Sequence, residues 1–239
     1  MIEIKEYLGH LEQGYAEAFL CRGDDGRKYV VKSRQSGRES LIREWVCGHI
    51  GRELGLPVPP FDMVHAASSI AEFSGIEEMA ALADSPGFGS RFVMTTGDSA
   101  STALPVLNVA DVAAVDVWMR RRVLLFDWWI LNFDRTDDNP NLLWDPLTRD
   151  LHVIDHNLAF DSDPVARFWS GHIFRGDRAL LSDPGLRASN SASMHAIIHK
   201  LPEIWSNLPE SWTDASQLTL ARVETMLHRY EADDFWSQS

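Results

Sequence analysis

Apolar and polar residues follow two different periods along the first sixty residues. Residues 17–33 hold two short runs rich in β-branched and aromatic side chains, separated by Asp24-Asp25-Gly26. This pattern predicts two strands joined by a tight turn. Between residues 39 and 54, apolar side chains recur every three or four positions, and a segment rich in Gly and Pro follows. The helical spacing and the stop after it predict a helix that ends near Gly55.

The pattern changes near the middle of the chain. Residues 89–99 indicate a strand, and the small residues that follow indicate a loop. Residues 109–132 are strongly apolar at helical spacing and predict one long helix, and most of the remaining chain also predicts helix, apart from a serine-rich loop at 188–193. We therefore expect a β-rich N-terminal lobe over residues 1–98 and a larger, mostly helical C-terminal lobe over residues 99–239.

Acidic residues crowd the stretch from residue 133 to residue 157. It contains six aspartates and three asparagines around two apolar runs that predict a β-hairpin. Asp134 and Asn139 lie five residues apart, and Asp155 follows at the end of the second run, so the hairpin would return Asp155 toward the other two. A carboxylate that orients a hydroxyl, with an amide and a second carboxylate that hold magnesium, is the set used for phosphoryl transfer. A solvated loop capped by Asp and Asn side chains is the alternative.

Lys32 ends the second predicted strand, where a kinase-like fold keeps the lysine that binds nucleotide phosphates. A lysine at the end of a strand is more often a solvated charge. The helix that follows offers Glu39 or Glu44 as its partner. A helical wheel places Glu39 nearer the apolar face and so favours Glu39.

The composition and the charge of the chain argue against several classes of protein. The 239 residues are 45% hydrophobic, which suits a folded chain with a buried core, and the net charge of −13 opposes direct binding to nucleic acid. No apolar run reaches the roughly 18 residues that span a membrane, and the first ten residues lack the pattern of a signal peptide. We expect a cytoplasmic protein without a membrane partner. Cys21 and Cys47 are expected to be free thiols.

Four segments together resemble the HipA-like kinases: YVVKS, REWVCGHIGRELGLPVPPF, LNFDRTDDNPNLLW and LHVIDHN, which occur in the family's order within residues 15–160. The resemblance implies an α+β, bilobal, protein-kinase-like fold and the use of ATP and Mg²⁺. It also implies that Asp134 acts on the acceptor hydroxyl, that Asn139 and Asp155 bind metal, and that Lys32 binds the phosphates. The family's glutamate falls on Glu44, eleven residues before Gly55.

The chain departs from the kinase pattern in three places. Gly14, Gly23 and Gly26 do not form the G-x-G-x-x-G phosphate loop, Asn157 stands where related chains commonly have glycine, and no A-P-E segment occurs. The leading interpretation is an ATP- and Mg²⁺-dependent phosphotransferase of the HipA-like type, acting on a serine or threonine hydroxyl of an unidentified protein substrate. The alternatives are a non-catalytic nucleotide-binding pseudokinase or scaffold module, and a kinase for a lipid or small molecule.

Overall fold

The computed structural model describes residues 1–11, 18–95, 102–161 and 165–237. The chain divides into two compact units. The first comprises Met1–Trp45, Pro59–Ala103 and Leu208–Gln217, and the second comprises Val46–Val58, Leu104–Asn207 and Leu218–Ser239. The lobe boundary expected between residues 98 and 99 lies outside the described residues and stays a prediction.

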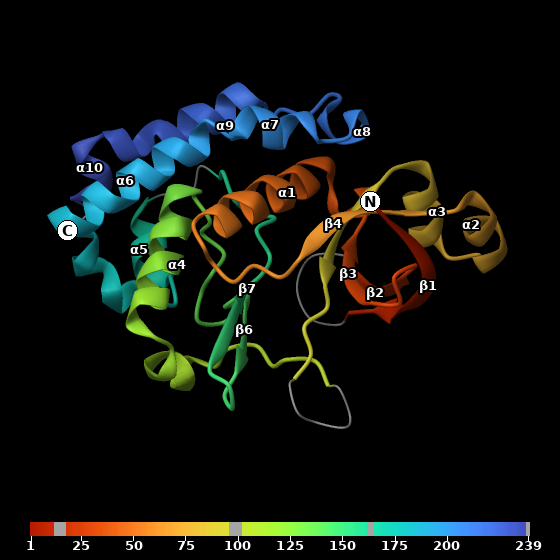
Figure 1. Ribbon diagram of the computed structural model, residues 1–239, viewed down its shortest axis with the longest axis horizontal. Helices are drawn as coiled ribbons and strands as arrows, with labels where there is room; N and C mark the ends of the chain where they lie inside the picture. The colour runs from red at the N-terminus through yellow and green to blue at the C-terminus, as the bar shows by residue number, and fades with distance from the viewer. Residues whose placement is uncertain (12–17, 96–101, 162–164, 238–239) are drawn as a thin grey trace. The chain divides into compact units, whose positions relative to one another are not determined.

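The first unit is built on a closed barrel of five strands in the order β1-β2-β3-β5-β4 (Figure 1). Neighbouring strands are antiparallel except β4 and β1, which pair in parallel and close the barrel. The strands are β1 (Ile2–His10), β2 (Ala18–Gly23), β3 (Lys28–Lys32), β4 (Phe61–Ala66) and β5 (Gly87–Arg91). The strand expected at 89–99 therefore begins two residues earlier and ends at Arg91, and residues 96–99 lie outside the described part.

The hairpin predicted over residues 17–33 is confirmed for its described residues. Strands β2 and β3 pair with Cys21 opposite Tyr29. The turn is held by Asp25, whose carboxylate accepts hydrogen bonds from the Arg27 N–H at 2.9 Å and the Tyr29 hydroxyl at 2.7 Å. Gly26 has a φ of 77°, which glycine adopts without strain.

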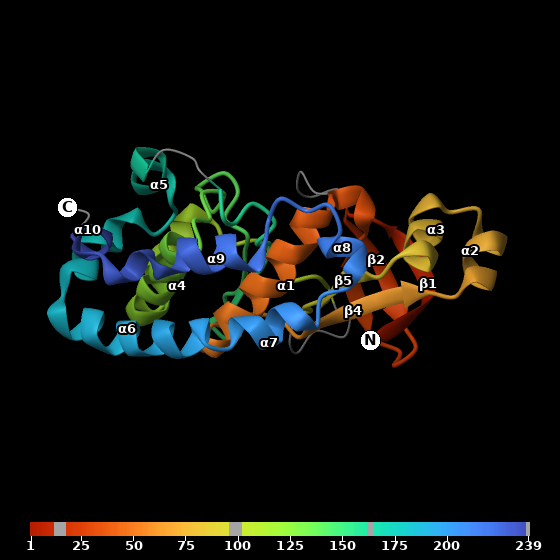
Figure 2. The ribbon, with the colours of Figure 1, turned by 90° about the horizontal axis from the view of Figure 1, so that it is seen from above.

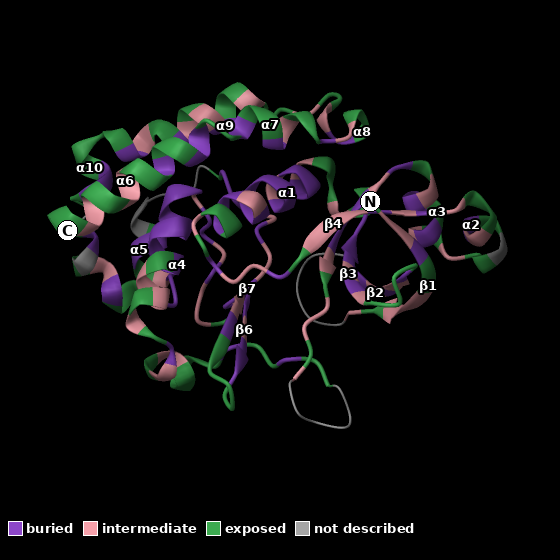
Figure 3. Cartoon of the chain, in the orientation of Figure 1, coloured by how far each residue is buried: buried purple, intermediate pink, exposed green. Residues whose placement is uncertain are grey.

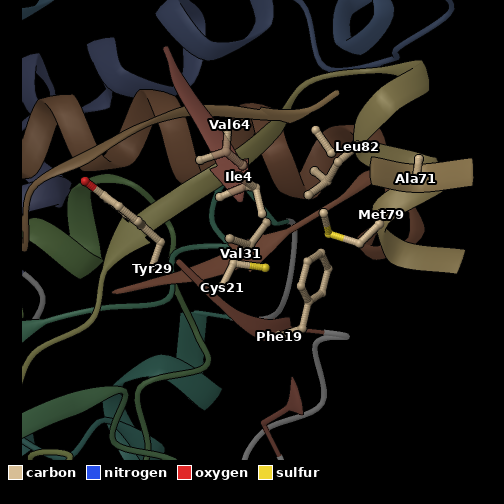
Figure 4. Packing of buried hydrophobic residues seen from close by; sticks show 10 residues of the cluster. Ile4, Phe19, Cys21, Tyr29, Val31, Val64, Ala71, Met79 and Leu82 are labelled. Atoms are coloured by element: carbon tan, nitrogen blue, oxygen red, sulfur yellow. The ribbon is translucent and has the colours of Figure 1, made fainter. Parts of the chain in front are cut away.

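Apolar side chains from the strands and from two helices, α2 (Ser68–Ser74) and α3 (Glu77–Asp84), fill the core of the first unit. Figure 4 shows Phe19, Cys21 and Val31 packing with Met79 and Leu82 of α3. Helices α2 and α3 lie beside each other at one end of this unit in both views of the ribbon (Figures 1 and 2), and η1 (Arg34–Ser36) and α8 (Glu210–Thr213) also belong to it.

The helix predicted after β3 is confirmed as α1 (Arg38–Glu53). It is buried along most of its length (Figure 3), and the buried residues include Ser40 and Glu44 as well as Leu41, Ile42 and Val46. A helix that is covered on several sides has no single core face. A helical wheel was therefore a poor guide to which glutamate points inward.

The second unit is mostly helical, with one two-stranded sheet of β6 (Leu142–Asp145) and β7 (Asp150–Val153) that confirms the predicted hairpin. Helices α6 and α7 follow one another along one side of the unit (Figure 2). Besides the end of α1 from Val46 onward, its helices among the described residues are η2 (Val109–Ala114), α4 (Val117–Trp129), α5 (Val165–Gly171), η3 (Arg175–Ser182), α6 (Pro184–Ile198), α7 (Leu201–Ser206), α9 (Leu220–Leu227), η4 (His228–Glu231) and α10 (Asp233–Trp236).

Two predictions of local structure in this unit are wrong. The single helix expected over 109–132 is split into η2 and α4, because the Asp116 side chain accepts hydrogen bonds from the N–H groups of Trp118 and Met119 and caps a new helix there. The serine-rich loop is part of α6. Ser189 and Ser193 bond their hydroxyls to backbone carbonyls one turn earlier, which lets serine sit inside a helix.

The core of the second unit forms around two neighbouring tryptophans of α4. Trp128 is 1% exposed and Trp129 is completely buried. Their indole N–H groups donate to the carbonyl oxygens of Phe235 at 3.0 Å and Leu227 at 2.7 Å, so each large side chain is buried with its polar group satisfied. Cys21 and Cys47 are both buried, and neither forms a disulfide, as expected. In the described part of the chain, no helix combines the length and the apolar character needed to cross a membrane.

Candidate active site

Lys32 and Glu44 form a buried ion pair within the first unit. Lys32 is the last residue of β3 and lies between Ala18 of β2 and Phe88 of β5, so the strand that carries it is paired on both sides. Its Nζ lies 2.5 Å from Oε1 of Glu44, and only 7% of the lysine side chain and 3% of the glutamate side chain are exposed. Because both charged groups are removed from water, the attraction between them offsets part of the cost of burying each one.

Glu39, the residue favoured by the helical wheel, lies elsewhere. Its carboxylate forms an ion pair with Arg43 at 3.1 Å, one turn along α1, and accepts a hydrogen bond from the Gln217 N–H at 3.2 Å. The wheel-based preference for Glu39 is wrong, because the buried face of α1 includes Glu44.

Asp134 and Asn139 are brought together in the loop that follows α4. The Asn139 Nδ2 donates to Asp134 Oδ2 at 2.7 Å, and the Asn141 Nδ2 donates to the same oxygen at 3.0 Å. Since a carboxylate can only accept, the amide nitrogen of Asn139 must face Asp134. In the described part of the chain, Oδ1 of Asp134 and Oδ1 of Asn139 have no hydrogen-bond partner. Asp134 is therefore anchored through Oδ2 and Asn139 through Nδ2, and in each side chain Oδ1 is the remaining polar atom.

The hairpin β6–β7 places Asp155 at the same end as Asn139. Leu142 pairs with Val153, and the Ile154 N–H then donates to the Asn141 carbonyl at 3.1 Å. Continuing this antiparallel register leaves Asn139 and Asp155 just beyond the last paired residues. Asp155 has a φ of 57°, a left-handed conformation that is strained for a residue other than glycine.

A buried cluster of charged side chains, which includes Arg135 of the loop that follows α4, was not predicted from the sequence. Asp127 of α4 accepts hydrogen bonds from Arg135 Nε at 2.6 Å, His172 Nε2 at 3.0 Å and Asn132 Nδ2 at 3.0 Å, and the side chains of Asp127 and Arg135 are completely buried. The available signal was the single carboxylate of Asp127 inside an otherwise apolar helical run, since a buried aspartate needs partners. No pattern in the sequence indicates that His172 is one of them.

The charge states in this cluster follow from its contacts. Burial by itself would raise the pKa of Asp127, but the positive charge of Arg135 and the hydrogen bond from His172 lower it to about 2. Burial lowers the pKa of His172 below its usual value, against the opposing effect of Asp127. The His172 Nδ1 accepts a hydrogen bond from the Phe174 N–H at 3.0 Å, which fits a neutral ring that donates from Nε2.

The residues at this end of the hairpin suit magnesium. Among the described residues, no three His, Cys, Asp or Glu side chains gather in a way that could hold a metal ion by themselves. Magnesium is usually bound by one or two carboxylates together with substrate phosphates and water, so it does not need such a cage. The donor set of Asn139 and Asp155 consists of oxygens, which a hard cation prefers.

Two of the solved structures that are similar to the chain are those of kinases. One solved structure similar to the chain is that of CtkA, a proinflammatory kinase of Helicobacter pylori, with 13% identity over 99% of this chain and 97% of that chain and a TM-score of 0.50. Another is the Golgi casein kinase, with 14% identity over 96% of this chain and 70% of that chain and a TM-score of 0.51. At these identities the likeness shows a protein-kinase-like fold.

The family model of the HipA-like kinases matches residues 4–239, and the chain belongs to that family. The resemblance noted in the sequence is therefore confirmed, and with it a kinase-type phosphotransferase. No curated protein matches the chain.

Proposed function

We propose that the protein is an ATP- and Mg²⁺-dependent kinase that phosphorylates a serine or threonine hydroxyl of a protein substrate. In this proposal residues 1–98 form the nucleotide-binding lobe and residues 99–239 the catalytic lobe of a bilobal kinase. The proposal is supported by membership of the HipA-like kinase family and by the arrangement of Asp134 and Asn139.

The observation that carries the proposal is the unequal environment of the two Asp134 oxygens. Two amide N–H groups hold Oδ2, which keeps the carboxylate oriented. The second oxygen, Oδ1, is left to accept a hydrogen bond from an incoming hydroxyl and to orient that hydroxyl for attack. A capping aspartate accepts from backbone N–H groups, as Asp116 does, whereas both donors to Asp134 Oδ2 are side-chain amides.

The other residues take roles that match their surroundings. Lys32 binds the α- and β-phosphates, and Glu44 orients its ammonium through the buried ion pair. Asn139 and Asp155 would hold Mg²⁺ through their oxygens. When bound, the ion neutralises charge that develops on the phosphate oxygens.

One observation favours the non-catalytic alternative. The segment where kinases carry a glycine-rich loop has no G-x-G-x-x-G, and of its three glycines Gly23 ends β2 and Gly26 lies in the turn after it. Gly14 lies outside the described residues. A nucleotide-binding scaffold would keep Lys32 and Glu44 but would not need the open oxygen of Asp134.

Incubation of the purified protein with γ-labelled ATP and Mg²⁺, alone and with a cell lysate, separates these functions. Label in phosphoserine or phosphothreonine of a protein supports the proposal. Label in a lipid or small-molecule fraction would show that the acceptor is not a protein and would favour a kinase for a lipid or small molecule. Nucleotide binding without transfer to any fraction would support the scaffold, and the absence of both binding and transfer would overturn every form of the proposal.

A further inference from the structure

The guanidinium of Arg135, the residue directly after Asp134, contacts several segments of the candidate active site at once. The side chain is completely buried. Its Nε donates to Asp127 at 2.6 Å. Its Nη1 lies within hydrogen-bond distance of three backbone carbonyl oxygens, those of Pro140 at 3.1 Å, Ile154 at 3.4 Å and Asn141.

These carbonyls adjoin the proposed metal ligands. Pro140 is the residue after Asn139, and Ile154 is the residue before Asp155. Arg135 is itself bonded through its backbone to Asp134. One side chain therefore joins the backbone next to the residue proposed to orient the hydroxyl and next to both residues proposed to hold metal.

A second set of contacts fixes Arg135 from the other side. The Ile173 N–H donates to the Arg135 carbonyl at 3.0 Å, and Thr136 forms a β-bridge with His172. His172 also bonds Asp127, the carboxylate that balances the charge of Arg135. The backbone of Arg135 is thus hydrogen-bonded to Ile173, and its side chain is linked to His172 through Asp127. Both Ile173 and His172 lie far along the chain from residues 133–141, the candidate catalytic loop.

We infer that Arg135 is a positioning residue, which sets the spacing between Asp134, Asn139 and Asp155 through the backbone carbonyls that its guanidinium holds. Its catalytic consequence rests on the proposed function. Only a planar guanidinium can bond a carboxylate through Nε and carbonyls through Nη1 at the same time, and the compact ammonium of lysine cannot span both. Displacement of a catalytic group by about 1 Å can lower turnover by about a hundredfold.

The chain offers a matched control in Arg120. Its Nε donates to Asp177 at 2.7 Å, and its Nη1 donates to the carbonyls of Val115 at 2.8 Å and Val112 at 3.3 Å. Arg120 thus bonds one carboxylate and backbone carbonyls, as Arg135 does, but no residue of the catalytic loop or of the hairpin is among these partners. Arg135→Lys and Arg120→Lys remove comparable interactions in two different places.

The test compares these two variants with the wild type in turnover, in the Mg²⁺ concentration for half-maximal activity, and in hydrogen–deuterium exchange. We expect both variants to lose thermal stability. Only Arg135→Lys should lower turnover by about a hundredfold, raise the Mg²⁺ requirement, and speed the exchange of peptides that cover residues 134–141 and 153–157. Equal turnover and equal exchange of these peptides in both variants would overturn the inference.

Two further measurements keep the test decisive. If Arg135→Lys does not fold, Asp127→Asn, which is nearly isosteric and removes the charge that holds Arg135, replaces it with the same expected results. If the wild type transfers no phosphate, the proposed function fails. The exchange of the two peptides, measured without any substrate, then still decides whether Arg135 positions the loop.

Discussion

The buried ion pair of Lys32 and Glu44 predicts opposite effects on stability and on activity when it is replaced as a unit. With 7% and 3% of the two side chains exposed and 2.5 Å between Nζ and Oε1, neither charge is compensated by bulk water. Lys32→Met leaves the buried carboxylate of Glu44 without the ammonium, and Glu44→Leu leaves the ammonium without the carboxylate.

The size of each effect follows from this burial. Removal of one member of a buried ion pair costs about 3–5 kcal/mol. In a protein of this length each kcal/mol lowers Tm by about 2–4 °C, so each single variant should lose roughly 6–20 °C. Replacement of both charges by apolar side chains of similar size is often neutral or stabilising. The double variant Lys32→Met/Glu44→Leu should therefore regain most of the lost stability.

Thermal unfolding of the wild type, the two single variants and the double variant measures this coupling, and phosphotransfer is assayed on the same samples. We expect the double variant to melt near the wild type and to have no activity. Glu39→Leu is the control, since its partly exposed pair with Arg43 should be worth no more than about 1 kcal/mol. If the losses of the two single variants simply add in the double variant, the buried pair is not the coupled unit described here.

Two other predictions concern metal and pH. ATP should raise Tm much more with Mg²⁺ than with EDTA, and Asp155→Asn should remove that difference; equal shifts in all samples would contradict the metal assignment. Because burial lowers the pKa of His172 below its value of 6.5 in the unfolded chain, the unfolded state takes up a proton first as the pH falls. The stability that depends on neutral His172 should thus be lost below pH 6.5, by at most about 1.4 kcal/mol per pH unit, and His172→Gln should flatten Tm measured from pH 8 to pH 5; an unchanged profile would argue against a buried neutral ring.

The elements that the sequence predicted well are those with local causes. Both hairpins were found, because a turn sequence and two short apolar runs lie next to each other in the chain. The split at Asp116 was missed because hydrophobic spacing continues across it, and only the cap marks the start of the second helix. Glu39 was favoured over Glu44 by a wheel that assumes one buried face, whereas tertiary packing covers several sides of α1.

In the candidate site too, residues set by local sequence were predicted and residues set by tertiary contacts were not. Asp134, Asn139 and Asp155 were selected by short spacings and one hairpin, and their functional roles stay predictions. Nothing in the sequence assigned Arg135 a role beyond its position next to Asp134. Its importance depends on a partner in α4 and on His172, which lies 45 residues beyond Asp127 in the chain. A single sequence carries no signal for a contact of that kind.

The most direct test of the proposed chemistry is the substitution Asp134→Asn, measured for ATP·Mg²⁺ affinity and for phosphotransfer on the same preparation. Asparagine is nearly isosteric and keeps a carbonyl oxygen that can accept from the amides of Asn139 and Asn141, so the loop should keep its shape. It removes the negative charge that orients and draws the proton of the acceptor hydroxyl. We predict unchanged nucleotide affinity and a loss of turnover of roughly two orders of magnitude or more. Loss of ATP binding in Asp134→Asn, or phosphotransfer at the wild-type rate, would contradict the assignment of Asp134 as the catalytic residue.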